Sequence, residues 1–93
     1  MFDDILQRRR ERIGSLHYVM TLHAEEEMHH DGLSIYDVEY CFLTGSIVQR
    51  QADEKSGEWK YRVRGTATDG SAMETVAKLS PTDMLVIITV YVV

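Results

Sequence analysis

The sequence predicts an α+β fold, with helices in its first half and an antiparallel β-sheet in its second. Two consecutive helical segments each end at a glycine, Gly32 and Gly45, a frequent C-terminal stop for helices. Residues 59–66 then alternate between apolar or small residues and basic or polar ones, and a period of two residues is that of a strand, which we place at 58–66. Asp69-Gly70 follows as a hairpin signal. Helices therefore come first along the chain, and hairpin-connected strands follow.

The first predicted helix is followed by a short strand. Apolar residues at helical spacing, with charged residues between them, predict an amphipathic helix over residues 3–13 that ends at Gly14 and Ser15. Residues 16–20 are β-prone and predict a strand. We expect the N-terminal helix to cover an open face of the sheet, to form a homodimer, or to occupy a groove that a separate partner protein would otherwise fill.

The next two helices form a predicted helical hairpin. Thr21 is a favourable N-cap for a helix over residues 22–31. Ser34, with Asp37 three residues later, predicts the start of a third helix that continues to Gly45. Its apolar stripe is formed by Ile35, Val38, Phe42 and Leu43.

The second half predicts four strands, at residues 47–51, 58–66, 72–79 and 84–92. Turns are expected at Asp69-Gly70 and at residues 81–83. The last strand is apolar on both faces, so we expect it in a central position beside strand 16–20. Residues of the last strand point alternately to its two faces, and we expect the helical hairpin to bury one of these two sets. The buried set is either Met84, Val86, Ile88, Val90 and Val92 or the residues between them.

Length and composition narrow the class of protein. The 93 residues predict a single domain spanning 1–93, with 44% apolar and 27% charged residues. A single cysteine, Cys41, excludes an intrachain disulfide and favours a reducing compartment. The longest apolar stretch, residues 84–93, is too short for a membrane-spanning helix, and no secretory signal is visible. We therefore expect a soluble, cytoplasmic protein without a membrane partner.

The charge of this chain is unevenly distributed. The net charge of −5 argues against a dedicated nucleic-acid binder, since phosphate contacts supply most of such affinity. Residues 21–40 contain six acidic residues and no Lys or Arg, whereas residues 46–66 contain five basic residues and three acidic ones. The helices are therefore acidic, and one strand is basic.

The basic strand is the main candidate site. Lys60, Arg62 and Arg64 alternate along it, so their side chains are predicted to lie on one sheet face about 7 Å apart. Such a row can bind phosphates, and arginine can stabilise the charge that builds up during phosphodiester cleavage. Tyr91 of the last strand is a candidate for the same face. The alternative is a solvated outer face that acids on neighbouring strands, such as Glu74, neutralise.

The second helix raises the question of a metal site. His23, Glu26, Glu27 and His30 lie on one helical stripe and are potential zinc ligands. One helix seldom supplies a complete site, however, so the interpretation favoured is an exposed acidic face with no metal and no cofactor. Cys41 is expected to be a buried small hydrophobe and not a nucleophile.

Several short motifs occur in a consistent order along the chain. They are Thr21-Leu22-His23-Ala24, Met28, Gly32-Leu33-Ser34, Asp37-Val38, Leu43-Thr44-Gly45, Tyr61-Arg62-Val63 with Gly65, Asp69-Gly70 and Val86-Ile87-Ile88-Thr89-Val90-Tyr91. From about residue 17 to residue 92 the chain resembles the family called domain of unknown function 4258. This resemblance implies the architecture of RelE/ParE-type toxins: a helical hairpin packed on a curved antiparallel sheet of four to five strands, here over residues 16–92.

The resemblance also implies a function. RelE/ParE-type toxins cleave messenger RNA with basic and tyrosine side chains on the exposed sheet face, and an antitoxin protein is their partner. By this resemblance Lys60, Arg62 and Arg64 would bind RNA. Arg62, Arg64 and Tyr91 would act in catalysis, with His23 a further candidate for proton transfer.

One departure from the family pattern concerns the second helix. The family usually has arginines there, before the Met and before the Gly, where this chain has Glu27 and Asp31. The strand arginines are retained.

Two functional hypotheses follow from these patterns. The first is a metal-independent endoribonuclease related to RelE-type toxins. The second is a non-catalytic binding module or homodimer, favoured by the acidic net charge, the two reversed charges at Glu27 and Asp31, and the surplus apolar face of the sheet. The Arg8-Arg9-Arg10 run is too short and too mixed with acids to predict a nucleic-acid-binding arm.

Overall fold

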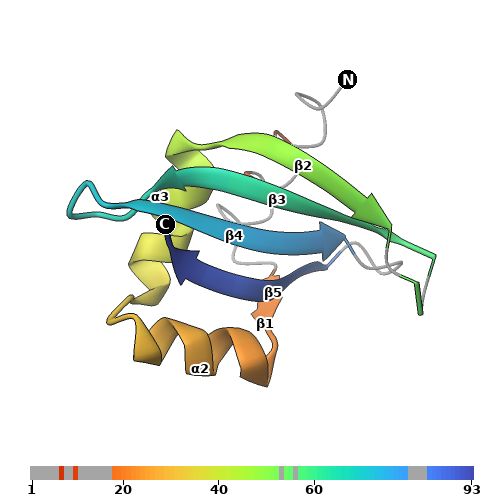
Figure 1. Cartoon of the computed structure of the whole chain (residues 1–93), viewed down its shortest axis with the longest axis horizontal. Coiled ribbons are helices and arrows are strands. Elements are labelled where there is room, and N and C mark those ends of the chain that lie inside the picture. The colour runs from red at the N-terminus through yellow and green to blue at the C-terminus, as the bar shows by residue number, and fades with distance from the viewer. Residues whose placement is uncertain (1–6, 8–9, 11–17, 53, 56, 80–83) are drawn as a thin grey trace.

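The computed structural model describes residues 7, 10, 18–52, 54–55, 57–79 and 84–93, and within these it is an α+β protein (Figure 1). Two helices and five strands follow one another as β1 (Tyr18–Met20), α2 (Leu22–His30), α3 (Ile35–Thr44), β2 (Ser46–Ala52), β3 (Trp59–Thr66), β4 (Ala72–Leu79) and β5 (Leu85–Val92). The predicted order of elements is therefore confirmed from β1 onwards. The helix expected over 3–13, apart from residues 7 and 10, and the turn expected at 81–83 lie outside the described residues.

The sheet is mixed, which corrects the prediction of a purely antiparallel sheet. Its strand order is β1-β5-β4-β3-β2. Strands β2 to β5 form an antiparallel meander, whereas β1 pairs with β5 in parallel along Leu85–Ile87. The parallel pair arises because β1 and β5 are separated by the whole helical hairpin and the meander, so no tight turn fixes their direction. The expected central position of the last strand is confirmed.

Helices α2 and α3 cover one face of the sheet and one edge of β5. Figure 1 shows α3 behind β3 and β4, and α2 alongside β5. Phe42, Val38 and Cys41 of α3 are fully buried, together with Ala24 of α2. Their partners in the core, on the strands and at the end of β3, are Val63, Ala67, Met73, Ala77, Leu85, Ile87 and Val90. The opposite sheet face, on which the described residues place no helix, is called the open face below.

Two glycines allow α3 to pass close to the sheet. A Cβ atom at either Gly45 or Gly65 would overlap the backbone carbonyl oxygen of Cys41. Any side chain at these positions would force the end of α3 away from β3. Arg10 also contacts this end of the helix: its Nε donates to the Phe42 carbonyl at 2.9 Å, and an Nη donates to the Gly45 carbonyl at 3.1 Å. These bonds satisfy carbonyls at the C-terminal end of α3.

The buried residues of β5 match neither of the two predicted alternating sets. Leu85, Ile87 and Val90 are fully buried. The register with β4 pairs Ala77 with Ile87 and Val76 with Thr89, so Ile88 is an extra residue, a β-bulge. A bulge turns every later side chain of the strand to the opposite face. The buried residues are therefore odd-numbered before the bulge (Leu85, Ile87) and even-numbered after it (Val90). The prediction was wrong because it assumed an uninterrupted period of two.

Asp37 joins the start of α3 to the turn between β3 and β4. One carboxylate oxygen accepts the Ser34 backbone N–H at 2.8 Å, as the predicted capping pair requires. The other oxygen accepts the Thr68 hydroxyl at 2.6 Å and the Thr68 backbone N–H at 2.8 Å. These hydrogen bonds, with that of the Thr68 hydroxyl first among them, lower the pKa of Asp37 from 3.8 to about 2.

Among the described residues, no helix combines the length and the apolar character that crossing a membrane requires.

We expect Asp37→Asn to lower the free energy of unfolding by about 2 kcal/mol at pH 7. Because the pKa of Asp37 is lower in the folded state than in the unfolded state, its contribution is complete above about pH 4. It is lost as the pH falls through about 2. Urea unfolding followed by circular dichroism at pH 7 and pH 3 measures this difference. The exposed residue Glu54, changed to Gln, is the control. A gap between Asp37→Asn and the natural chain that did not narrow at pH 3 would contradict this account.

Candidate functional site on the open face of the sheet

The open face brings together the three cations of β3, as the alternation predicted. Cross-strand pairing places side chains of four strands in rows across this face. One row contains Ser46, Arg64, Glu74 and Tyr91, the next contains Gln49, Arg62, Val76 and Thr89, and a third contains Gln51 and Lys60. Tyr91, which the sequence offered as a candidate for this face, therefore lies beside the arginines.

The central group of the first row is the carboxylate of Glu74, which is only 6% exposed. Its Oε1 atom lies 3.4 Å from Arg62 Nε and accepts a short hydrogen bond from the Tyr91 hydroxyl. Its Oε2 atom lies 3.8 Å from an Nη atom of Arg64. A nearly buried carboxylate is costly without positive partners, and here two guanidinium groups supply them.

The hydrogen bonding of this cluster is incomplete. Arg62 Nε is buried and makes no hydrogen bond of good geometry, although it faces Glu74 Oε1. The contact between Arg64 and Glu74 Oε2 is likewise an ion pair beyond hydrogen-bond distance. The side chains of Arg62 and Arg64 are 38% and 52% exposed, so a ligand can reach both arginines, although not the buried Nε of Arg62.

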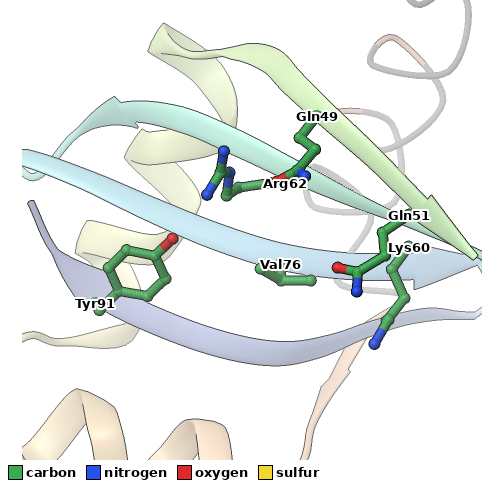
Figure 2. A pocket seen from close by; sticks show the side chains of 6 residues that line it. All are labelled: Gln49, Gln51, Lys60, Arg62, Val76 and Tyr91. Carbon is green, nitrogen blue, oxygen red and sulfur yellow. The ribbon is translucent and has the colours of Figure 1, made fainter. Parts of the chain in front are cut away.

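A hollow of about 210 Å³ lies next to this cluster, lined by Gln49, Gln51, Lys60, Arg62, Val76 and Tyr91. Figure 2 shows Arg62 and Tyr91 toward one end of it, Lys60 with Gln51 at the other end, and Val76 between them. We call this the Arg62 hollow. It presents two cations, two amides and a phenol around a small apolar floor, which suits a charged ligand with further hydrogen-bonding groups.

Tyr91 is a hydrogen-bond donor in this arrangement. Burial raises the pKa of its phenol above 10, and the hydrogen bond to Glu74 raises it further. The phenol therefore keeps its proton at neutral pH and donates a hydrogen bond to the Glu74 carboxylate. The guanidinium of Arg62 opposes this effect without reversing it.

His23 is not part of the arginine cluster. Its Nε2 atom lies 3.1 Å from Glu27 Oε1 on the same helix. Together with Glu26, Glu27, His30, Asp31 and Tyr91 it lines a second hollow of about 450 Å³ beside α2. Tyr91 lines both hollows. His23 is therefore connected to the strand residues of the site through a hollow that it shares with Tyr91.

The acidic residues of α2 have a structural role in the fold. Beyond its pairing with β1, β5 has backbone N–H groups on its outer edge that need acceptors. Glu27 Oε1 accepts from Val90 at 3.3 Å, and an Asp31 carboxylate oxygen accepts from Val92 at 3.0 Å. Within the described part of the chain, no three His, Cys, Asp or Glu side chains are grouped in a way that could hold a metal ion.

Cys41 is a buried thiol, as expected. Its sulfur lies 3.7 Å from the Thr75 hydroxyl and 3.8 Å from the carbonyls of Val63 and Met73. Burial raises its pKa. A protonated thiol among core residues packs as a small hydrophobe and is a poor nucleophile.

Sequence reasoning missed three residues of this site. Glu74 was considered only as a neutralising acid, because an Asp69-Gly70 turn of two residues would place Thr75 opposite Arg64, whereas the actual loop is one residue longer and places Glu74 there. Gln49 and Gln51 were not considered at all. They face the hollow because a bulge between Ile47 and Gln49 shifts the parity of β2, and no sequence signal marks that bulge.

The comparison with protein families is positive. The model of the family described as domain of unknown function (DUF4258) matches residues 20–92, which is most of the chain. The chain belongs to the DUF4258 family. The comparisons with curated proteins and with solved structures gave no match. The DUF4258 match includes all five sheet strands at least in part and every residue of the Arg62 hollow.

We expect the ionisation of Tyr91 to depend on Glu74. In Glu74→Gln, the pKa of Tyr91 should fall toward 10, because the hydrogen bond to a carboxylate is lost while the burial remains. Carbon-13 NMR of Cζ-labelled tyrosine, titrated between pH 8 and 12.5, measures this change. Tyr18 is the internal control, since burial and its hydrogen bond to Glu39 raise its pKa to about 12 independently of Glu74. A Tyr91 titration that is unchanged in this variant would contradict the described contact.

Proposed function

We propose that this DUF4258 protein is a metal-independent endoribonuclease with the architecture of RelE/ParE-type toxins, and that it binds RNA on the open face. One observation carries the proposal: Arg62 and Arg64 converge on Glu74 beside Tyr91, at the edge of a hollow that Lys60 also lines. Helix α3 covers the other face, and α2 lies along the edge of β5. The side chains of Arg62 and Arg64 are 38% and 52% exposed, so both arginines are accessible to a polymer.

The chemistry of the face supports a phosphodiester ligand. Guanidinium groups match the oxygens of a phosphate, and charge-assisted hydrogen bonds of this kind are among the strongest in proteins. The exposed parts of the Arg62 and Arg64 side chains can bind the non-bridging oxygens of a phosphate. There they would also stabilise the charge that builds up on phosphorus during cleavage.

The acidic net charge of the protein is compatible with this proposal. Glu27 and Asp31, two of the acids on α2, bind the edge of β5 and do not face the Arg62 hollow. Affinity for a polyanion depends on the local row of cations, and it should fall steeply with rising salt concentration.

The double variant Arg62→Ala, Arg64→Ala tests the proposal. Induced expression of the natural chain should arrest growth of the host and cleave messenger RNA. We expect the double variant to lose the arrest and to cleave RNA about 10²- to 10³-fold more slowly in vitro, because the developing phosphate charge is no longer stabilised. Growth curves and the time course of cellular RNA give the measurement.

The control for this experiment is Arg50→Ala. Arg50 lies on β2, pairs with Tyr61, and stacks on Trp59 with its guanidinium carbon 4.2 Å from the ring centroid. It faces away from the Arg62 hollow, so this variant should keep full activity. Normal growth and intact RNA with abundant soluble natural protein would refute the ribonuclease proposal.

The second candidate function is a non-catalytic interaction module, and α3 supplies the observation that favours it. Tyr36, Tyr40 and Leu43 lie at positions i, i+4 and i+7 of this helix and are 70%, 42% and 56% exposed. A contiguous apolar stripe of this kind is typical of a helix that packs against another helix. We propose a second copy of this chain as its partner, packed stripe to stripe.

A homodimer through α3 should be lost in the double variant Tyr36→Ser, Leu43→Ser. Light scattering and sedimentation velocity on the natural chain should show a dimer, and on the variant a monomer, while the circular dichroism spectra stay the same. Val48→Ser, a substitution of an exposed apolar residue on β2, is the matched control and should leave the dimer intact. A natural chain that is monomeric at high concentration would exclude self-association.

A further inference from the structure

We propose that Glu74 is the general base of the open face, taking the proton from the ribose 2′-hydroxyl of the bound strand. This inference rests on the proposed ribonuclease function and narrows its substrate. The strand must be RNA, cleaved at a nucleotide with a free 2′-hydroxyl, and the products are a 2′,3′-cyclic phosphate and a 5′-hydroxyl.

The position of Glu74 carries the first part of the argument. It is the only acidic side chain in the three described rows of the open face, and it lies between Arg64 on β3 and Tyr91 on β5. At 6% exposure it is nearly removed from water, so its carboxylate accepts hydrogen bonds from protein groups and competes little with bulk solvent. A base in this position is adjacent to the two cations that would hold the phosphate.

The unused hydrogen-bonding capacity of the cluster carries the second part. Oε1 receives the Tyr91 hydroxyl, whereas Oε2 meets Arg64 at 3.8 Å, beyond hydrogen-bond distance. Each oxygen of an ionised carboxylate has two lone pairs, so Oε2 can accept a hydrogen bond from a ribose hydroxyl. Arg64, whose side chain is 52% exposed and whose Nη atom lies 3.8 Å from Oε2, is a donor for a phosphate oxygen. An acceptor and a donor are thus available side by side, as a ribose hydroxyl and its neighbouring phosphate require.

The step is balanced without any further reactant. Glu74 takes the proton of the 2′-hydroxyl, and the 2′-oxygen forms a bond to the adjacent phosphorus. The bond between phosphorus and the 5′-oxygen breaks, and the leaving oxygen takes a proton from water. Arg62 and Arg64 stabilise the negative charge on the non-bridging oxygens during the attack. The hydroxide formed from water then receives the proton held on Glu74, which restores the site.

Tyr91 is a positioning residue in this scheme. Its hydroxyl donates to Oε1 and so orients the carboxylate, and its phenol remains protonated through the neutral range. Lys60 and Gln51 lie at the far end of the Arg62 hollow and are placed to hold a neighbouring phosphate or base. Tyr91→Phe should therefore weaken catalysis less than loss of Glu74, and it should leave the identity of the cleavage products unchanged.

The test uses Glu74→Gln, a substitution that keeps the size of the side chain and removes the base. A fluorescent single-stranded RNA reports cleavage, and the same sequence with 2′-O-methyl riboses reports binding alone. We expect the natural chain to cleave the first strand and to bind the second without cleaving it. Glu74→Gln should cleave at least 10²-fold more slowly, yet bind the 2′-O-methyl strand as tightly or more tightly, since both arginines lose their internal partner.

The pH profile separates catalysis from structure. The rate with the natural chain should rise as a carboxylate ionises, and this acidic limb should be absent from the residual activity of Glu74→Gln. Glu58→Gln is the matched control, because Glu58 pairs with Lys78 at 3.8 Å and does not line the Arg62 hollow. It should leave both the rate and the profile unchanged.

Each outcome decides between the two proposals. If the natural chain neither binds nor cleaves RNA, the ribonuclease function fails. If it cleaves and Glu74→Gln cleaves within about threefold of it, Glu74 is not the base, although the function stands. If Glu74→Gln does not fold, the natural chain alone decides: cleavage of the 2′-O-methyl strand, or products without a 2′,3′-cyclic phosphate, would overturn the inference.

Discussion

The arrangement of the helices around the sheet follows from the backbone hydrogen bonding of β5. This strand is apolar on both faces, and every polar group along its two edges needs a partner. Strand β4 supplies one edge. On the other edge β1 pairs with only three residues, and the Glu27 and Asp31 carboxylates of α2 then accept the N–H groups of Val90 and Val92. The helix is thereby fixed beside the sheet, and α3, following it through a tight turn at Gly32, is directed across the face that becomes the core.

This arrangement explains why α2 is acidic although the proposed ligand is an anion. The Glu27 and Asp31 carboxylates each accept one backbone N–H of β5, whereas an arginine at either position could only donate. The charges of α2 therefore serve the edge of β5. The cluster on the open face has its own net positive charge, because one carboxylate, that of Glu74, lies beside the two guanidinium groups of Arg62 and Arg64. The sign of the charge at the site therefore depends on these neighbouring side chains and not on the net charge of −5.

Two β-bulges determine which side chains reach the open face. In an uninterrupted strand Tyr91 would share a face with Leu85 and Ile87 and point into the core; the extra residue in β5 turns it to the opposite face. The bulge in β2 does the same for Gln49 and Gln51. Bulges are found near functional sites because they redirect side chains in this way. Five of the six residues that line the Arg62 hollow, all except Lys60, come from the two bulged strands or lie directly opposite a bulge.

Local sequence patterns were sufficient to predict most helices and strands and the shared face of the three β3 cations. Caps at Thr21 and Ser34, glycine stops and the strict alternation of β3 are local signals, so they were sufficient for α2, α3 and the common face of Lys60, Arg62 and Arg64. The parallel pairing of β1, the bulges and the approach of Tyr91 to Glu74 are visible only in the folded protein. These features depend on which strands become neighbours and on packing against the helices, and such long-range choices leave no periodic signal in a single chain.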